Sequence, residues 1–181
     1  KPIRKPEDIK GMKIRVLATP MERAVPAVFG GTGVPIPYSE VVPALQKKVV
    51  DGARTSLVVM AASKFFTVVK NITVLNGGAI PTGTWLSKAW ANKLPADLRK
   101  LVLTVPAELE DWGSKNAIAR YKVSEQQWRD NGAEIIHFSP ADHKRYMDAI
   151  RKVGVDYLTN HKNAEVREIY GLFKQAVAAT R

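Results

Sequence analysis

The chain has 181 residues, 45% of them hydrophobic, which is enough to form a core in one domain or in one and a fraction. It has 28 Lys and Arg against 17 Asp and Glu, a formal net charge of +11, and no cysteine. The lack of cysteine excludes disulfides, thiolate metal sites and cysteine nucleophiles. No apolar run has the length needed to cross a bilayer, so we expect a protein that is not itself membrane-spanning.

The excess of positive charge is compatible with a nucleic acid, an anionic membrane surface or an anionic ligand as partner. Apart from Lys47, Lys48 and residues 1–15, the basic residues are scattered singly along predicted helices. A nucleic-acid face usually gathers them in a stripe with interleaved aromatic residues. We therefore expect no nucleic-acid partner and attribute most of the charge to a solvated surface.

The first part of the chain alternates between strand and helix signals. The patterns predict a strand at 13–17, a helix at 20–29, an extended stretch at 34–38, a helix from Ser39 to Gly52, a strand at 53–59, a helix at 63–70 and a strand at 72–75. In the first strand Ile14 and Val16 share one face, so Arg15 points to the other.

The second part is dominated by helices. The patterns predict a strand at 84–87, a very long helix at 95–131 with a bend near Pro106, a strand at 134–138, a helix at 141–158 and an amphipathic helix over 166–177. Strands joined by helices of this length indicate parallel crossovers. The predicted fold class is therefore α/β, with a central, mainly parallel sheet covered by helices on both faces.

The sequence offers no convincing catalytic, cofactor or metal motif. The run GGTG at 30–33 lacks the further glycine of a dinucleotide fingerprint, because Ile36 stands there, and Pro35 and Pro37 prevent the helix that should follow. The three histidines have no acidic residue at ligand spacing. We therefore predict no catalytic residue, no cofactor and no metal, and we expect Trp85 and Trp90 to pack in a core.

Arg15 is the strongest candidate for a functional side chain. Three predicted parallel strands end near Leu17, Tyr38 and Leu57, and the carboxyl edge of such a sheet is the usual place for a small ligand. An arginine at this edge is suited to a small organic anion. From the residues alone, an edge or salt-bridge role for Arg15 remains an alternative.

Several linked motifs resemble those of the solute-binding proteins of TRAP transporters, the dicarboxylate-type periplasmic family. The resemblance covers nearly the whole chain at matched spacing. The motifs are PEDIKG at 6–11, KIRV at 13–16, PYSEV at 37–41, ALQ at 44–46, VDG at 50–52, SKFF at 63–66 and LP at 94–95.

The resemblance implies a periplasmic-binding-protein-like fold of type II, with two lobes around a cleft and one long lobe-spanning helix. Residues 1–80 and 125–181 would form the second ligand-binding lobe. Residues 81–124 would belong to the first lobe, which is otherwise missing. We accordingly expect the chain to be part of a longer periplasmic protein whose signal peptide and first lobe are not present here.

The resemblance also implies roles for individual residues. Arg15 would pair with the ligand carboxylate through two parallel charge-assisted hydrogen bonds, each contributing about 1.5–3 kcal/mol when shielded from water. Tyr38 would line the pocket, and Ala18 and Thr55 would be pocket positions that vary with the ligand. Many members have an acidic residue where this chain has Arg54, so Arg54 either turns outward or joins the anion site; the sequence leaves both open.

The function implied is that of an extracytoplasmic subunit that captures a small organic carboxylate, closes around it and delivers it to the TRAP membrane subunits. An aromatic or short aliphatic carboxylate fits better than sialic acid. Two other classes remain as alternatives. One is an enzyme on a similar bilobal scaffold, and the other is a basic interaction module that binds an acidic partner or nucleic acid.

Overall fold

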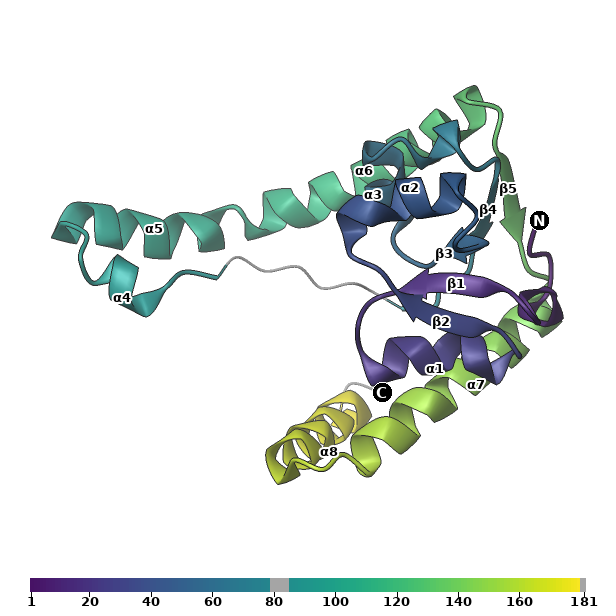
Figure 1. Cartoon of the computed structure of the whole chain (residues 1–181). Coiled ribbons are helices and arrows are strands. Elements are labelled where there is room, and N and C mark those ends of the chain that lie inside the picture. Colours follow the sequence, from purple (N-terminus) through teal and green to yellow (C-terminus); the bar gives the residue numbers. More distant parts are fainter. Residues whose placement is uncertain (79–84, 180–181) are drawn as a thin grey trace.

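A computed structural model of the chain describes residues 1–78 and 85–179 (Figure 1). Two small parallel sheets lie between two layers of helices, and an arm of helices projects from this body. The α/β class predicted from the sequence is confirmed. The predicted single sheet is wrong for the described residues, because the strands form two separate sheets.

The first sheet has the strand order β2-β1-β3, with all strands parallel. Strand β1 (Lys13–Val16) lies in the middle, between β2 (Thr32–Pro35) and β3 (Gly52–Ala53). Arg15 is in register with Val34 on one side and Ala53 on the other. The central position of β1 therefore places Arg15 between the ends of two neighbouring strands.

The second sheet has two parallel strands, β4 (Asn71–Val74) and β5 (Glu134–His137). These strands are far apart in sequence, and the long helical excursion between them returns the chain to form the pair. Both strands were predicted within one residue at each end. Each strand has one buried residue, Ile72 in β4 and Ile136 in β5. The other residues of both strands are partly or fully exposed.

Helices cover the sheets on both sides (Figure 1). On one side lie α1 (Pro20–Val28) and α7 (Pro140–Thr159), which contact each other. On the other lie α2 (Val41–Gln46), α3 (Leu57–Ala62) and α6 (Glu110–Asp130). The main core is on this second side, where Trp128 of α6 is fully buried against residues of α3 and of the short 3-10 helix η3 (Phe65–Thr67).

The arm consists of α4 (Lys88–Ala91), α5 (Ala96–Glu108) and the first part of α6, and it extends away from the body (Figure 1). Large apolar side chains on the arm and just before it are exposed: Trp85 is 92% exposed, and Trp90, Leu101, Trp112 and Ile118 are also exposed. The prediction that Trp85 and Trp90 pack in a core is therefore wrong within this structure. The last helix, α8 (Ala164–Ala179), packs against α7.

Several predicted elements differ from those in the structure. The expected strand at 53–59 is only β3, and the helix α3 begins at Leu57, because Leu57, Met60 and Ala61 are buried at helical spacing. The helix expected from Ser39 to Gly52 is the 3-10 helix η2 (Tyr38–Glu40) followed by α2, which ends at Gln46. Lys48, with φ 57°, takes the left-handed conformation expected of Gly52.

The helix expected at 63–70 is the 3-10 helix η3. The helix expected at 95–131 is interrupted between α5 and α6, at Leu109. Of the strand expected at 84–87, Thr84 lies outside the described residues and the other three residues are not in a strand.

The close approach of α1 to β2 depends on Gly33. A Cβ atom at this position would lie 2.7 Å from Cα of Arg23, a backbone atom that cannot move aside cheaply. We expect Gly33→Ala to lower the free energy of unfolding by about 1–3 kcal/mol. Gly113→Ala is the matched control: nothing lies within 4 Å of its added Cβ, so it should raise stability by about 0.5–1 kcal/mol. Urea denaturation of both variants checks this, and equal effects would contradict it.

Candidate functional site

The carboxyl edge of the first sheet brings together three of the predicted site residues. Ala18 follows β1, Tyr38 follows β2 and Thr55 follows β3. Since the three strands are parallel, their carboxyl ends lie at the same edge. Ala18 and Tyr38 are exposed, and Thr55 is partly buried. The edge is therefore formed by side chains of different size from three separate loops.

Arg15 lies just below this edge and is only 3% exposed. Its Nε donates a hydrogen bond to the carbonyl oxygen of Ile36 at 2.9 Å, and its guanidinium carbon lies 5.8 Å from the centroid of the Tyr38 ring. Within residues 1–78 and 85–179, Arg15 has no acidic partner. The Nε hydrogen bond thus fixes the Arg15 side chain, while no carboxylate of the described residues balances its positive charge.

The two terminal nitrogens of Arg15 are the donors that remain. Neither makes a hydrogen bond within the described part of the chain, where no side-chain nitrogen is both fully buried and unpaired. Both nitrogens therefore retain a small accessible surface. A planar pair of donors in this state is suited to a carboxylate, which accepts two parallel hydrogen bonds.

Tyr38 is held in place by contacts that the sequence did not reveal. Its hydroxyl donates to the carbonyl oxygen of Val59 at 2.9 Å and is 2.8 Å from the hydroxyl of Ser63. Its ring stacks on Phe65, with centroids 6.0 Å apart and an interplanar angle of 17°. Ser63 and Phe65 lie in the SKFF motif noted above, but the motif alone gave no reason to connect them with Tyr38. The ring is therefore a rigid wall beside Arg15.

Arg54 lies on the other side of the sheet from Arg15. Ala53, which is in register with Arg15, packs towards the core around α3, and the alternation of the strand turns Arg54 the opposite way. There it forms an ion pair with Glu22 of α1. Burial works to lower the pKa of Arg54, but Glu22 and Tyr146 raise it by more, so its pKa lies above the ordinary value.

The structure therefore pairs Arg54 with an acid and leaves Arg15 without one. Glu22 was not predicted, because nothing in the sequence links it to a residue 32 positions away. This ion pair balances the charge of Arg54, whereas the charge of Arg15 is balanced by no described residue.

A cavity of about 640 Å³ separates the two sheets, and we call it the β3–β4 cavity. Its walls include β3 with the loop to Ser56 and β4 with the loop to Gly78. Arg54 and Thr55 line it, but Arg15, Tyr38 and Ala18 do not. The β3–β4 cavity is thus distinct from the surface where Arg15 and Tyr38 meet.

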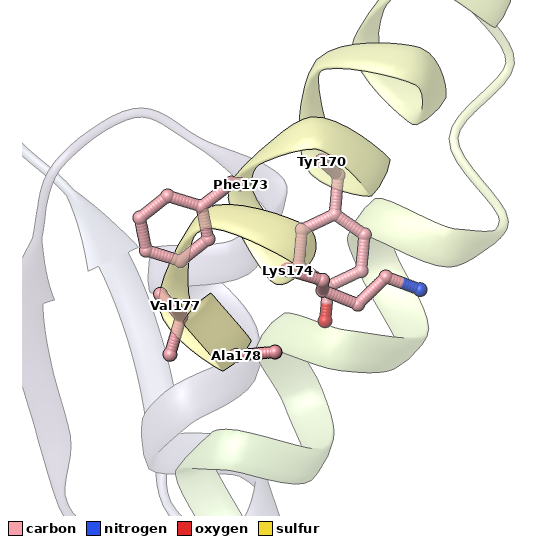
Figure 2. A pocket seen from close by; sticks show the side chains of 5 residues that line it. All are labelled: Tyr170, Phe173, Lys174, Val177 and Ala178. Atoms are coloured by element: carbon pink, nitrogen blue, oxygen red, sulfur yellow. The ribbon is translucent and has the colours of Figure 1, made fainter. Parts of the chain in front are cut away.

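A second hollow lies on α8 and is shown in Figure 2. Tyr170, Phe173, Lys174, Val177 and Ala178 line it. The ammonium group of Lys174 lies 4.9 Å from the centroid of the Tyr170 ring. All the lining residues that the structure describes come from one helix, and they do not provide the convergent polar groups that are typical of a ligand site.

Across residues 1–78 and 85–179, no three His, Asp or Glu side chains gather in a way that could hold a metal ion. Among the described helices, none combines the length and the apolar character needed to cross a membrane.

A family model and the curated relatives of this chain point to the same protein family. Residues 1–160 match the model of DctP, the bacterial extracellular solute-binding protein family 7. A curated relative is the C4-dicarboxylate-binding periplasmic protein DctP of Shewanella loihica, which is 27% identical over 157 residues. That match covers 86% of this chain and 47% of the relative. The chain thus spans about half the length of the curated relatives it matches.

Comparison with solved structures gives the same family. A TRAP periplasmic solute-binding protein of Rhodoferax ferrireducens with bound malonate is 28% identical, has a TM-score of 0.82, and the match covers 99% of this chain and 57% of that one. A second, from Shewanella oneidensis with bound succinate, is 28% identical with a TM-score of 0.77, and the match covers 93% of this chain and 55% of that one. The chain belongs to the DctP family of bacterial extracellular solute-binding proteins, and its fold is that of TRAP periplasmic solute-binding proteins.

Proposed function

We propose that the chain is part of the solute-binding subunit of a TRAP transporter and that Arg15 binds the carboxylate of a small organic acid. One observation carries this proposal: Arg15, a residue that is only 3% exposed, has no acidic partner in the described part of the chain. Keeping an unpaired charge out of water costs several kcal/mol, so a carboxylate that pairs with it stabilises the site. The succinate and malonate named for the two similar structures support this ligand class.

The proposed domain organisation is that residues 1–80 and 125–181 form the second lobe of a two-lobed protein, while 81–124 belong to the first lobe. Two observations support it. The chain spans about half the length of its relatives, and the arm exposes Trp112 and Ile118 at 63% and 69%. Large apolar side chains on one helix are typical of a surface that packs against another part of a protein.

Binding would then proceed without catalysis. The anion enters the open cleft, the two terminal nitrogens of Arg15 donate to its carboxylate, and the Tyr38 ring covers one side of it. Closure of the two lobes excludes water and strengthens these bonds, because charges interact more strongly in a low dielectric. The closed form would deliver the ligand to the membrane subunits from the periplasm, and no enzymatic step is required.

A thermal-shift panel of the full-length protein tests this function. Ligand at a hundred times its Kd stabilises the native state by about 2.7 kcal/mol, so we expect succinate, malonate or a related carboxylate to raise Tm by several degrees. Uncharged analogues should have no effect. If no small carboxylate shifts Tm while nucleic acid binds with a steep salt dependence, the protein is a basic interaction module instead. Turnover of the bound acid would indicate an enzyme.

A further inference from the structure

Arg54 is connected to Arg15 through the backbone. Its amide donates a hydrogen bond to the carbonyl oxygen of Arg15 at 2.9 Å. This bond lies one residue beyond β3, where the chain turns away towards Thr55. The side chain of Arg15 is held from the other direction, by the hydrogen bond of its Nε to Ile36. Arg15 is therefore supported through its side chain near the end of β2 and through its backbone near the end of β3.

The side chain of Arg54 reaches the start of α1. Its partner there, Glu22, lies in the first turn of this helix, and the Glu22 amide donates to Oγ of Thr19 at 3.1 Å. The Thr19 amide in turn donates to the carbonyl oxygen of Leu17 at 2.8 Å. Ala18, one of the predicted pocket positions, therefore lies inside a turn whose helical end is tied to Arg54.

Together these contacts close a ring. From Arg15 the chain runs through the Ala18 turn into α1 as far as Glu22. The ion pair leads from Glu22 to Arg54, and the Arg54 amide returns to Arg15. Loss of the ion pair opens the ring at one point, so that the Ala18 turn and the end of β3 are free to separate.

The ion pair that closes the ring is shielded from water. The side chains of Arg54 and Glu22 are 28% and 18% exposed. Every other ion pair in the described part of the chain has at least one side chain that is 49% exposed or more. Salt screens a shielded pair less than a surface pair, and the pair contributes more to holding its two elements together.

We propose that Arg54 and Glu22 are positioning residues of the carboxylate site, whose ion pair holds Arg15 and the Ala18 turn in the arrangement that binds before the ligand arrives. This rests on the proposed function, in which Arg15 binds the carboxylate. Arg54 itself does not contact the ligand, because its side chain is turned to the other face of the sheet. If the binding arrangement is only partly populated, the apparent Kd rises in proportion, and the loss lies in the association rate.

Stopped-flow measurement of malonate binding to the full-length protein tests this role. Glu22→Gln removes the charge of the acid and keeps its shape. We expect it to lower the association rate constant roughly 5- to 30-fold and to change the dissociation rate constant by less than about twofold. Arg129→Met is the matched control, because it breaks the more exposed ion pair with Glu125 on α6, and it should change neither rate constant.

An exchange of the two charges separates positioning from direct contact with the ligand. The double variant with Glu22→Arg and Arg54→Glu restores an ion pair with both signs reversed. We expect its association rate constant to return to within about threefold of the value for the unmodified protein. A direct contact between Arg54 and the carboxylate predicts no such rescue.

A measurement without ligand keeps this test separate from that of the proposed function. The backbone amide of residue 54 reports on the bond to Arg15 in every variant. Glu22→Gln should speed its hydrogen exchange by about tenfold or more. The Thr32 amide, which donates to Met12 at 2.8 Å on the other side of β1, should be unchanged. If the unmodified protein binds no malonate, the proposed function fails, and the exchange at residue 54 still decides whether the ion pair holds Arg15.

Three results would overturn the proposal. Unchanged exchange at residue 54 in Glu22→Gln would mean that the ion pair does not hold the end of β3. A lower Tm with unchanged malonate kinetics would give the pair a role in stability alone. Faster dissociation of malonate, without rescue by the exchange of charges, would place Arg54 in contact with the ligand.

Discussion

Replacing Arg15 by alanine in the full-length protein is expected to weaken binding of its carboxylate by about 2–4 kcal/mol, roughly 30- to 800-fold in Kd. The reason is that the ligand would lose both charge-assisted hydrogen bonds while its carboxylate is still removed from water. The affinity of Arg15→Lys should lie between that of the unmodified protein and that of Arg15→Ala, because an ammonium keeps the charge but not the planar pair of donors. Isothermal titration calorimetry measures all three affinities.

Lys13→Ala is the matched control for that experiment. It removes one positive charge from the same strand, but Lys13 is exposed. Its backbone amide donates to the Asp51 carboxylate, and its ammonium group has no hydrogen bond or ion pair within the described residues. Its Kd should stay close to that of the unmodified protein. Equal losses for Lys13→Ala and Arg15→Ala would show that the general positive charge attracts the anion. Unchanged binding in Arg15→Ala would remove Arg15 from the site.

Replacing Trp128 by alanine is expected to lower the free energy of unfolding by about 3–5 kcal/mol, the range for deletion of a large aromatic side chain from a core. Trp128 is 0% exposed and packs edge-on against Phe66, with ring centroids 5.7 Å apart. Its indole N–H also points to the carbonyl oxygen of Leu57, at 3.5 Å. These contacts fix α6 to the layer that holds Tyr38.

Urea denaturation followed by far-ultraviolet circular dichroism checks this without relying on the removed fluorophore. Gln127→Ala, on the same turn of α6, is the control: Gln127 is exposed, and its replacement should change stability by less than about 0.5 kcal/mol. A loss below about 1 kcal/mol for Trp128→Ala would mean that α6 is not anchored through this side chain.

The sequence predicted the elements that a local pattern specifies. The alternation of the strand correctly set Ile14 and Val16 on one face, where they pack together with Met12, and Arg15 on the other. The run after Arg54 was wrongly predicted as a strand. A short apolar run is compatible with the repeat of a helix and with that of a strand. Only the packing of α3 on α6 decides in favour of a helix.

Features that depend on distant residues were beyond the reach of the sequence. The division of the strands into two sheets follows from how distant segments pair, and no local residue pattern reports it. The Arg54–Glu22 ion pair and the hydrogen bonds of Tyr38 join elements far apart in the chain. The exposure of Trp85 was missed because tryptophan is usually buried, and an apolar surface on an arm has the same composition as a core.

The most direct test of the role of Arg15 is a crystal structure of the full-length protein with succinate or malonate bound. We predict that the two terminal nitrogens of Arg15 each lie about 2.7–2.9 Å from one oxygen of a ligand carboxylate, with the Tyr38 ring against the ligand. A carboxylate held elsewhere, for example by Arg54 freed from Glu22, with no ligand oxygen within hydrogen-bond distance of Arg15, would contradict the account.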